Sequence, residues 1–361
     1  MKLIKVFHII SSLSRGGRER QLSILLSKNN MEVNNIAIVL NKTQSNYIEE
    51  YNLTDKIIFL KHRNIYKIII ELKNILKKEK PDIIWTWGGY EASFGMILSI
   101  FFNVIHINGS IRHGIVLYKW KQIWRKFILH LSKNIVSNSY AGLKANKIKR
   151  GQVLYNGISD FFFQSKLNKY LDRTNLLNLP QTTLLIISVA NLVPYKDYFT
   201  VLSALQKLKK AGYEFFYLIL GDGEMKSLIL KYIEKCELEN NVIIMGNINN
   251  VSDYLRISDL FIHSSQGEGC SNAIIEAMAC GLPILASDTG GTSEIVKNHF
   301  GYLFEYKNSN QLYIKIIEIL KNKTKLELMG ENAKKYAISN FSIDTMILNY
   351  NKIVREIYNK K

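Results

Sequence analysis

The chain has 361 residues, of which 47% are hydrophobic and 22% are charged, and this balance excludes a disordered chain and favours a globular protein with two domains. Its three cysteines, Cys236, Cys270 and Cys280, have no metal-ligand or redox spacing, which fits a reducing cytosol. The apolar run at residues 1–10 is too short for a signal peptide, and residues 92–107 fall short of a membrane-spanning helix.

The net charge of +18 is unevenly distributed along the chain. Residues 1–160 hold 25 Lys and Arg against 10 Asp and Glu, whereas residues 161–361 hold 23 against 20. No acidic residue lies between Glu91 and Asp160. The first half is therefore expected to face an anionic partner.

Apolar runs that alternate with helical patterns predict a parallel, doubly wound sheet in the first half. The first run, residues 3–10, leads into a loop with Gly16 and Gly17 and then into a helix from Arg18. A strand, a glycine turn and a helix form a possible anion site, although a tight turn that needs glycine explains the same pattern. Further strands are expected at residues 36–40, 57–60, 83–87, 104–107, 135–137 and 153–155.

A second α/β domain is expected over residues 183–340. The first domain then covers residues 1–165, a linker covers 166–182, and a C-terminal helix in 341–361 follows. Strands of the second domain are expected at residues 184–189, 215–220, 242–245, 260–263 and 284–286. Lys196 stands at a strand-to-helix junction, where it could meet a phosphate, or it could be an ordinary solvated lysine.

The stretch from Ser264 to Pro283 carries the strongest pattern in the chain. Glycines at 267 and 269 allow a sharp turn, and Ser271 or Asn272 can cap a helix that Gly281 ends. The free N–H groups of such a helix attract an anion. Two carboxylates, Glu268 in the loop and Glu276 about two turns into the helix, could each hold adjacent hydroxyls, so the pattern suits a phosphate flanked by two sugars. The competing reading is a strand, loop and helix with a buried capping acid.

The spacing Glu268-(seven residues)-Glu276, followed by Ala277-Met278-Ala279-Cys280-Gly281-Leu282-Pro283, resembles the motif of retaining glycosyltransferases of family 4. The resemblance implies the GT-B fold, in which two Rossmann-like domains face each other across a cleft and a C-terminal helix returns to the first domain. It also implies that Glu268 contacts the donor sugar, that Glu276 binds the nucleotide ribose and that Gly16 and Gly17 lie under the donor phosphates.

The same resemblance places the leaving-group phosphates on Lys196 and the base near Gly246. Many relatives carry an arginine where this chain has Asn191 or Val193, so Lys196 is expected to carry more of the charge. The predicted catalytic residues are Glu268 and Lys196, and the predicted donor-binding residues are Gly16, Gly17, Asn191, Lys196, Gly246, Glu268, Gly269, Cys270, Ser271, Asn272 and Glu276.

The implied reaction moves a sugar from a nucleotide-sugar, with UDP favoured over GDP, to a saccharide acceptor that is expected to be lipid-diphosphate-linked, in a bacterial surface polysaccharide pathway. No Asp-x-Asp occurs in the chain, so neither a metal nor any other cofactor is expected. A GT-B sugar-nucleotide 2-epimerase is the alternative, although the Ala-Met-Ala-x-Gly-x-Pro string and the Gly-Gly pair argue against it. A basic nucleic-acid-binding protein is a more distant alternative, because no recognised nucleic-acid motif occurs.

Two further sets of residues are expected in the first domain. The family usually has a histidine near the donor sugar where Asn108 stands, and the acceptor-side candidates are Arg15, Asn108, Arg112 and His113. The run from Tyr118 to Leu129 is basic and aromatic at helical spacing, which favours an anionic membrane surface over a solvated basic face of a core helix. Its predicted membrane contacts are Lys119, Trp120, Lys121, Trp124, Arg125 and Lys126, and they predict a cytoplasmic enzyme that is peripheral on the inner face of the plasma membrane.

Overall fold

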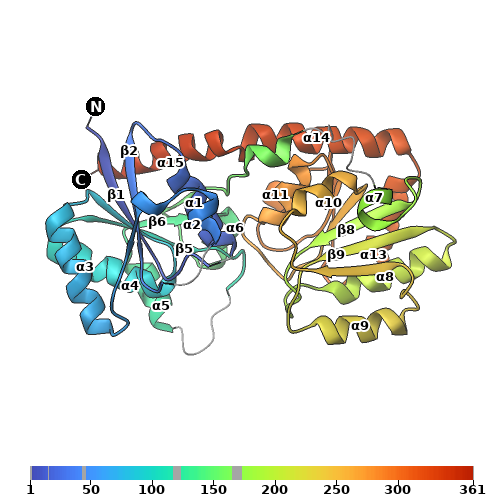
Figure 1. Cartoon of the computed structure of the whole chain (residues 1–361), viewed down its shortest axis with the longest axis horizontal. Helices are drawn as coiled ribbons and strands as arrows, with labels where there is room; N and C mark the ends of the chain where they lie inside the picture. Colours follow the sequence, from blue (N-terminus) through green and yellow to red (C-terminus); the bar gives the residue numbers. More distant parts are fainter. Residues whose placement is uncertain (1, 15, 43–45, 117–122, 165–172, 361) are drawn as a thin grey trace. The chain divides into compact units, whose positions relative to one another are not determined.

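A computed structural model describes residues 2–14, 16–42, 46–116, 123–164 and 173–360. The chain divides into two compact α/β units, and each is described by itself (Figure 1). Unit 1 comprises residues 1–157 and 343–361, and unit 2 comprises residues 158–342.

Unit 1 contains a seven-stranded parallel sheet in the order β3-β2-β1-β4-β5-β6-β7. The direction of the strand order reverses between β1 and β4, and such a switch point is where open α/β sheets bind ligands. The strands are β1 Ile4–Ile10, β2 Val33–Val39, β3 Ile57–Phe59, β4 Ile83–Thr86, β5 Ile105–Ile111, β6 Asn134–Ser137 and β7 Gly151–Val153. The helices are α1 Gly17–Ser27, α2 Asn46–Glu50, α3 Ile65–Glu79, α4 Gly89–Phe102, α5 Ile123–Leu131, α6 Tyr140–Ala145 and the C-terminal α15 Ile343–Tyr358.

Alternate side chains of β1 enter two separate cores, one on each face of the sheet. Val6 and Ile10 pack with α1 and α15, whereas Phe7 and Ile9 pack with α3 and α4. A strand that is buried on both faces reads as a continuous apolar run, which is why this strand was predictable from the sequence.

The C-terminal helix belongs to unit 1, as the sequence predicts, and it is held there by a buried polar network. The Tyr350 hydroxyl donates to Asn35 Oδ1 at 2.5 Å, and His8 Nε2 lies 3.0 Å from the same oxygen. Trp87 Nε1 donates to His8 Nδ1, so the ring hydrogen of His8 is on Nε2. Burial lowers the pKa of His8 to about 4.

Unit 2 contains a six-stranded parallel sheet in the order β10-β9-β8-β11-β12-β13, with its switch point between β8 and β11. The strands are β8 Leu184–Val189, β9 Phe215–Leu220, β10 Val242–Gly246, β11 Leu260–His263, β12 Ile284–Ser287 and β13 Gly301–Phe304. The helices are α7 Arg173–Leu177, α8 Tyr198–Lys210, α9 Lys226–Lys235, α10 Val251–Ile257, α11 Asn272–Ala279, α12 Thr292–Ile295, α13 Ser309–Leu320 and α14 Lys323–Phe341.

Strand β13 was not predicted from the sequence, because its Gly301-Tyr302 start interrupts the apolar run. Gly301 is required there, since a Cβ on it would lie 2.6 Å from the carbonyl oxygen of Ile284 on β12. Part of the predicted linker, residues 166–172, lies outside the described residues. Its later part contains α7, where the buried Arg173 donates to the Thr183 carbonyl and pairs with Asp259 at 2.6 Å within unit 2.

Candidate active site

Two loops at the switch point of unit 2 are joined through their backbones. Lys196, after β8, forms an antiparallel bridge with Ser265, after β11. The Asp197 N–H donates to the Ser264 carbonyl at 3.1 Å, and the Gln266 N–H donates to the Tyr195 carbonyl at 2.8 Å. Because β8 and β11 are neighbours in the sheet, segments about 70 residues apart in sequence meet at this edge.

The Lys196 and Glu268 side chains form an ion pair at this edge. Lys196 Nζ donates to Glu268 Oε1 at 2.5 Å, and the two side chains are 7% and 21% exposed. Burial acts to raise the pKa of Glu268, but the charge of Lys196 and the hydrogen bonds from Lys196 and His263 hold that pKa well below its usual range. Glu268 is therefore ionised at neutral pH.

His263, the last residue of β11, is a third member of this cluster, and the sequence analysis missed it. Its Nε2 lies 2.9 Å from Glu268 Oε2 and 3.3 Å from Lys196 Nζ. Burial and then the charge of Lys196 lower the pKa of His263, so the ring is neutral at pH 7. The signal that could have revealed it is a histidine at the carboxyl end of a predicted strand, immediately before the motif loop.

The motif segment forms the loop and helix that the sequence predicts. Ser271 is extended at the N-cap position of α11, and Cys270 and Ser271 are buried. Glu276 is buried in the second turn of α11. Gly281 follows with a φ of +80°, which is the left-handed conformation that favours glycine at a helix end.

Glycine allows the loops after β8, β9 and β10 to approach one another closely. The Gly221 N–H donates to the Gly246 carbonyl at 2.8 Å. Gly221 has a φ of +152°, and a Cβ on it would lie 2.0 Å from the Ala190 carbonyl oxygen. Gly246 has a φ of +70°, and Asn191 is exposed on the loop after β8. The predicted base-binding and phosphate-binding segments therefore lie at the same edge of the sheet.

The loop after β12 contacts the Glu268 segment directly. The Gly291 N–H donates to the Glu268 carbonyl at 2.8 Å, and Thr289 Oγ1 donates to the Ser265 carbonyl at 2.6 Å. These bonds fix the backbone on both sides of the Glu268 carboxylate.

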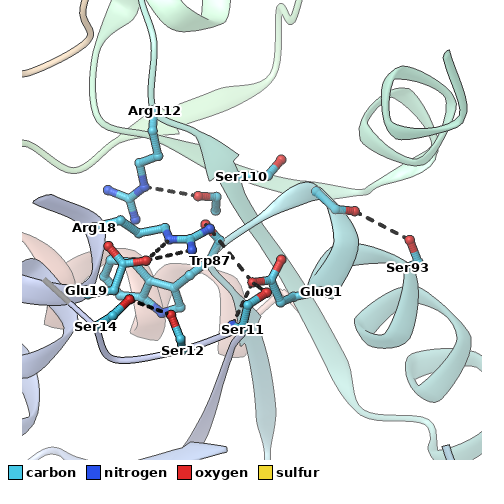
Figure 2. Close-up of polar contacts among 12 residues, drawn as sticks. Ser11, Ser12, Ser14, Arg18, Glu19, Trp87, Glu91, Ser93, Ser110 and Arg112 are labelled. Carbon is cyan, nitrogen blue, oxygen red and sulfur yellow. Dashed lines mark hydrogen bonds and ion pairs between the residues drawn. The ribbon is translucent and has the colours of Figure 1, made fainter. Parts of the chain in front are cut away.

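At the switch point of unit 1, a buried carboxylate joins the ends of β1 and β4 (Figure 2). Glu91 Oε1 accepts hydrogen bonds from Ser11 N at 2.8 Å and from Ser11 Oγ at 2.5 Å. Arg18 Nη1 lies 3.8 Å from the same oxygen, and Arg18 also pairs with Glu19 at 2.7 Å. Sequence analysis assigned neither Ser11 nor Glu91 to a site, because their interaction joins segments 80 residues apart in the chain.

Helices α1 and α4 begin in the same way, with a glycine at the N-cap and a glutamate three residues later. A Cβ on Gly16 would lie 2.2 Å from Glu19 Oε2, and a Cβ on Gly88 would lie 2.3 Å from Glu91 Oε2. Each glycine thus makes room for a carboxylate at the positive end of its helix. Gly17 is the first residue of α1, and the predicted contact of Gly16 and Gly17 with donor phosphates stays a prediction.

The predicted acceptor-side residues have different environments. Asn108 is fully buried inside β5, where its amide donates to Ser132 Oγ and accepts from the Ser110 N–H. Arg112 follows the last residue of β5, and its guanidinium lies 4.4 Å from the centre of the buried Trp87 ring (Figure 2). His113 is exposed, and Arg15 lies outside the described residues.

Helix α5 carries the described part of the predicted membrane contact. Trp124 and Lys126 are exposed, and Arg125 is half-buried with its guanidinium 5.6 Å from the Trp124 ring centre. Lys119, Trp120 and Lys121 lie outside the described residues. No helix in the described part of the chain is both long and apolar enough to cross a bilayer. Within the same residues, no group of three or more His, Cys, Asp and Glu side chains could hold a metal ion.

Comparison with known proteins places this architecture in a family. Residues 174–336 match the family model described as glycosyl transferases group 1. An Escherichia coli protein, UDP-Gal:alpha-D-GlcNAc-diphosphoundecaprenol alpha-1,3-galactosyltransferase, is 26% identical over 298 residues, which are 77% of this chain and 76% of that protein. Protein CapJ of Staphylococcus aureus is 30% identical over 287 residues, which are 77% of this chain and 65% of that protein. The crystal structure of the Anabaena protein HepE in complex with UDP and glucose has a TM-score of 0.82 at 17% identity, over 98% of this chain and 99% of that one.

Two parallel Rossmann-like sheets and a C-terminal helix that returns to unit 1 define the GT-B class of glycosyltransferases. The chain is a glycosyltransferase that uses a nucleotide-sugar donor, and its residues 174–336 match the glycosyl transferases group 1 family.

Proposed function

We propose that this enzyme transfers a sugar from a UDP-sugar to a saccharide hydroxyl, with retention at the anomeric carbon and without a metal ion. The observation that carries the proposal is the pairing of Lys196 with Glu268 at the switch point of unit 2, where α/β sheets bind nucleotides. The Lys196 ammonium group is a cation that can bind the diphosphate, and the Glu268 carboxylate can accept hydrogen bonds from sugar hydroxyls.

In the proposed reaction the bond from the anomeric carbon to the diphosphate oxygen breaks, and a bond to the acceptor oxygen forms on the same face of the sugar. The proton of the acceptor hydroxyl passes to the leaving diphosphate, which is the base on that face. Negative charge on the leaving oxygen is stabilised by Lys196 and by backbone N–H groups at the start of α11. Glu268 orients the donor sugar and Glu276 binds the ribose. This support for the leaving group requires no metal ion.

A nucleotide screen tests the donor side of the proposal. The purified protein is heated with UDP, GDP or ADP in EDTA, beside Glu276→Ala. A ligand present at a hundred times its Kd raises the free energy of unfolding by about 2.7 kcal/mol, and a melting curve detects this change. We expect UDP to stabilise the wild type and to lose most of this effect in Glu276→Ala. Binding that requires Mn²⁺ would contradict the metal-free mechanism, and a protein that binds no nucleotide would contradict the proposed function.

The acceptor side of the proposal rests on separate observations. The E. coli relative is named for a diphosphoundecaprenol-linked acceptor, and residues 1–160 of this chain carry an excess of 15 positive charges, 25 minus 10. We propose that the acceptor is a saccharide linked to a lipid diphosphate in a bacterial surface polysaccharide pathway. Arg112 and His113, which follow β5, are the candidates for contact with it.

A peripheral position on an anionic membrane leaflet follows from the same acceptor. Helices α4 and α5 pack against each other, and both expose apolar side chains. Phe101 and Phe127 are 77% and 63% exposed; the full set is Ile97, Ile100, Phe101, Ile123, Trp124, Phe127 and Leu131. Lys126 and Lys133 lie beside them, and the sequence has no acidic residue from 92 to 159. Apolar insertion together with basic attraction suits an anionic lipid surface.

Vesicle sedimentation tests the membrane contact. We expect the protein to sediment with phosphatidylglycerol-containing vesicles and to be released by salt. Insertion of one Trp or Phe side chain contributes about 1.5–3 kcal/mol, so Trp124→Glu with Phe127→Glu is expected to weaken partitioning more than tenfold. The matched control is Leu228→Glu with Leu230→Glu, which changes two exposed apolar residues of α9. Equal loss in both double variants would contradict the proposed surface.

A further inference from the structure

The side chains of Lys196, Glu268 and His263 contact one another beside the proposed donor site. The proposed reaction assigns roles to Lys196 and Glu268 but none to His263. Lys196 Nζ contacts Glu268 Oε1, and His263 Nε2 contacts Glu268 Oε2. The two oxygens of one carboxylate thus have different partners. Lys196 Nζ and His263 Nε2 are themselves 3.3 Å apart.

Only one assignment of hydrogens satisfies these contacts. A neutral ring nitrogen carries either a hydrogen or a lone pair, and a carboxylate oxygen can only accept. At 2.9 Å from Glu268 Oε2, His263 Nε2 must carry the hydrogen and donate it. It then has no lone pair for Lys196, so the 3.3 Å approach is a contact and not a hydrogen bond. Glu268 is therefore the common acceptor of two donors.

The two donors differ in their freedom to move. Lys196 has a flexible four-carbon stem and a point charge that any anion can attract. His263 is 3% exposed, ends β11, and stacks on Phe261 with an interplanar angle of 12°. When a diphosphate enters the site it competes with Glu268 for Lys196, whereas the imidazole stays where the sheet holds it.

We propose that Lys196 exchanges Glu268 for the donor diphosphate when the nucleotide-sugar binds, and that His263 is a positioning residue that keeps the Glu268 carboxylate directed at the donor sugar after Lys196 has left. The inference rests on the proposed function, because it takes the diphosphate as the ligand of Lys196 and the sugar as the ligand of Glu268. In the unliganded enzyme the ion pair holds the lysine in place and restrains diphosphate binding.

The first experiment compares two substitutions of His263. His263→Gln keeps an N–H donor, and His263→Met has a similar volume without a donor. UDP affinity is measured by calorimetry, and hydrolysis is measured with whichever of UDP-glucose, UDP-galactose and UDP-N-acetylglucosamine the wild type cleaves fastest. We expect both variants to bind UDP within twofold of the wild type. We expect kcat to fall at least tenfold in His263→Met and less than threefold in His263→Gln.

The second experiment measures the competition for Lys196. Glu268→Gln removes the competing charge, so this variant is expected to bind free UDP two- to tenfold more tightly than the wild type while its hydrolysis rate collapses. Lys196→Ala in the same background is expected to abolish that gain.

The outcomes separate the inference from the proposed function. A wild-type rate in His263→Met, an equal loss in His263→Gln, or a parallel fall in UDP affinity would overturn the positioning role. Unchanged or weaker UDP binding by Glu268→Gln would overturn the exchange of Lys196. A wild type that neither binds UDP nor cleaves any of the three donors would overturn the proposed function itself, and the inference with it.

Discussion

Replacement of Glu91 by alanine should destabilise unit 1 far more than replacement of an exposed glutamate by alanine. Glu91 is 1% exposed, and its Oε1 accepts two hydrogen bonds from Ser11, at 2.8 and 2.5 Å. Hydrogen bonds to a charged group contribute about 1.5–3 kcal/mol each, and they are not fully additive because both end on one residue. The pair with Arg18 adds less than about 1 kcal/mol, since Arg18 is 29% exposed. We expect Glu91→Ala to lower the free energy of unfolding by about 3 kcal/mol.

The change can be measured in unit 1 alone. All four tryptophans, Trp85, Trp87, Trp120 and Trp124, lie in that part of the chain, so their fluorescence in urea reports the unfolding of unit 1 without interference from unit 2. With a urea dependence of about 2 kcal/mol per molar, the midpoint should fall by about 1.5 M.

Two variants test the stated cause. Glu91→Gln keeps an oxygen acceptor and loses only the charge, so its loss should be about 1 kcal/mol. Glu49→Ala removes an exposed glutamate of the same unit and should change stability by less than about 0.5 kcal/mol. The reasoning is refuted if Glu91→Ala is no worse than Glu49→Ala. An equal loss in Glu91→Gln would show that the charge, and not the pair of hydrogen bonds, is responsible.

Three further predictions concern the loops, the buried histidines and the site lysine. Gly221→Ala would place a Cβ 2.0 Å from a backbone carbonyl oxygen, so we expect it to abolish UDP binding. By calorimetry it should lower the free energy of unfolding of unit 2 by more than about 2 kcal/mol, as severe steric substitutions do. Gly212→Ala, at a φ of +82° with nothing within 4 Å, should cost only about 1 kcal/mol; similar losses in both would point to backbone conformation alone. Burial lowers the pKa of both His8 and His106 to about 4. Below pH 6.5 the unfolded chain therefore takes up protons that the folded chain does not, and the free energy of unfolding of unit 1 should fall as the pH drops toward 4, by about 2 kcal/mol per histidine at pH 5. His106→Gln should remove about half of that slope in the tryptophan assay, and a slope unchanged by the substitution would rule out this origin. Lys196→Ala should weaken UDP binding at least tenfold by calorimetry, whereas Lys226→Ala, at an exposed lysine of the same unit, should not; equal effects would contradict a specific phosphate contact.

Much of the architecture could be predicted from local sequence. The strands of both sheets are short apolar runs, because parallel strands are buried on both faces and need no polar alternation. Ser264 to Pro283 combines two loop glycines, a serine at the N-cap position and a helix-ending glycine, each of which acts over a few residues. The loop and the start of α11 accordingly lie where the sequence places them.

Other features depend on which strands become neighbours, and no local pattern specifies that. Lys196 reaches Glu268 and His263 only because β11 lies beside β8, with β9 and β10 on the far side. Glu91 reaches Ser11 only because β4 lies beside β1. Asn108 was expected near the site from strand register; it is buried within β5, which continues to Ile111, and its site role stays a prediction.

The sequence by itself determined the α/β class, the motif helix and the charges available for chemistry, since these follow from propensity, periodicity and residue type. Only the tertiary structure decided which charges meet. In a doubly wound sheet the chain returns to the centre after forming one edge, and the pairing at that switch point is set by the packing of whole strands rather than by any short segment.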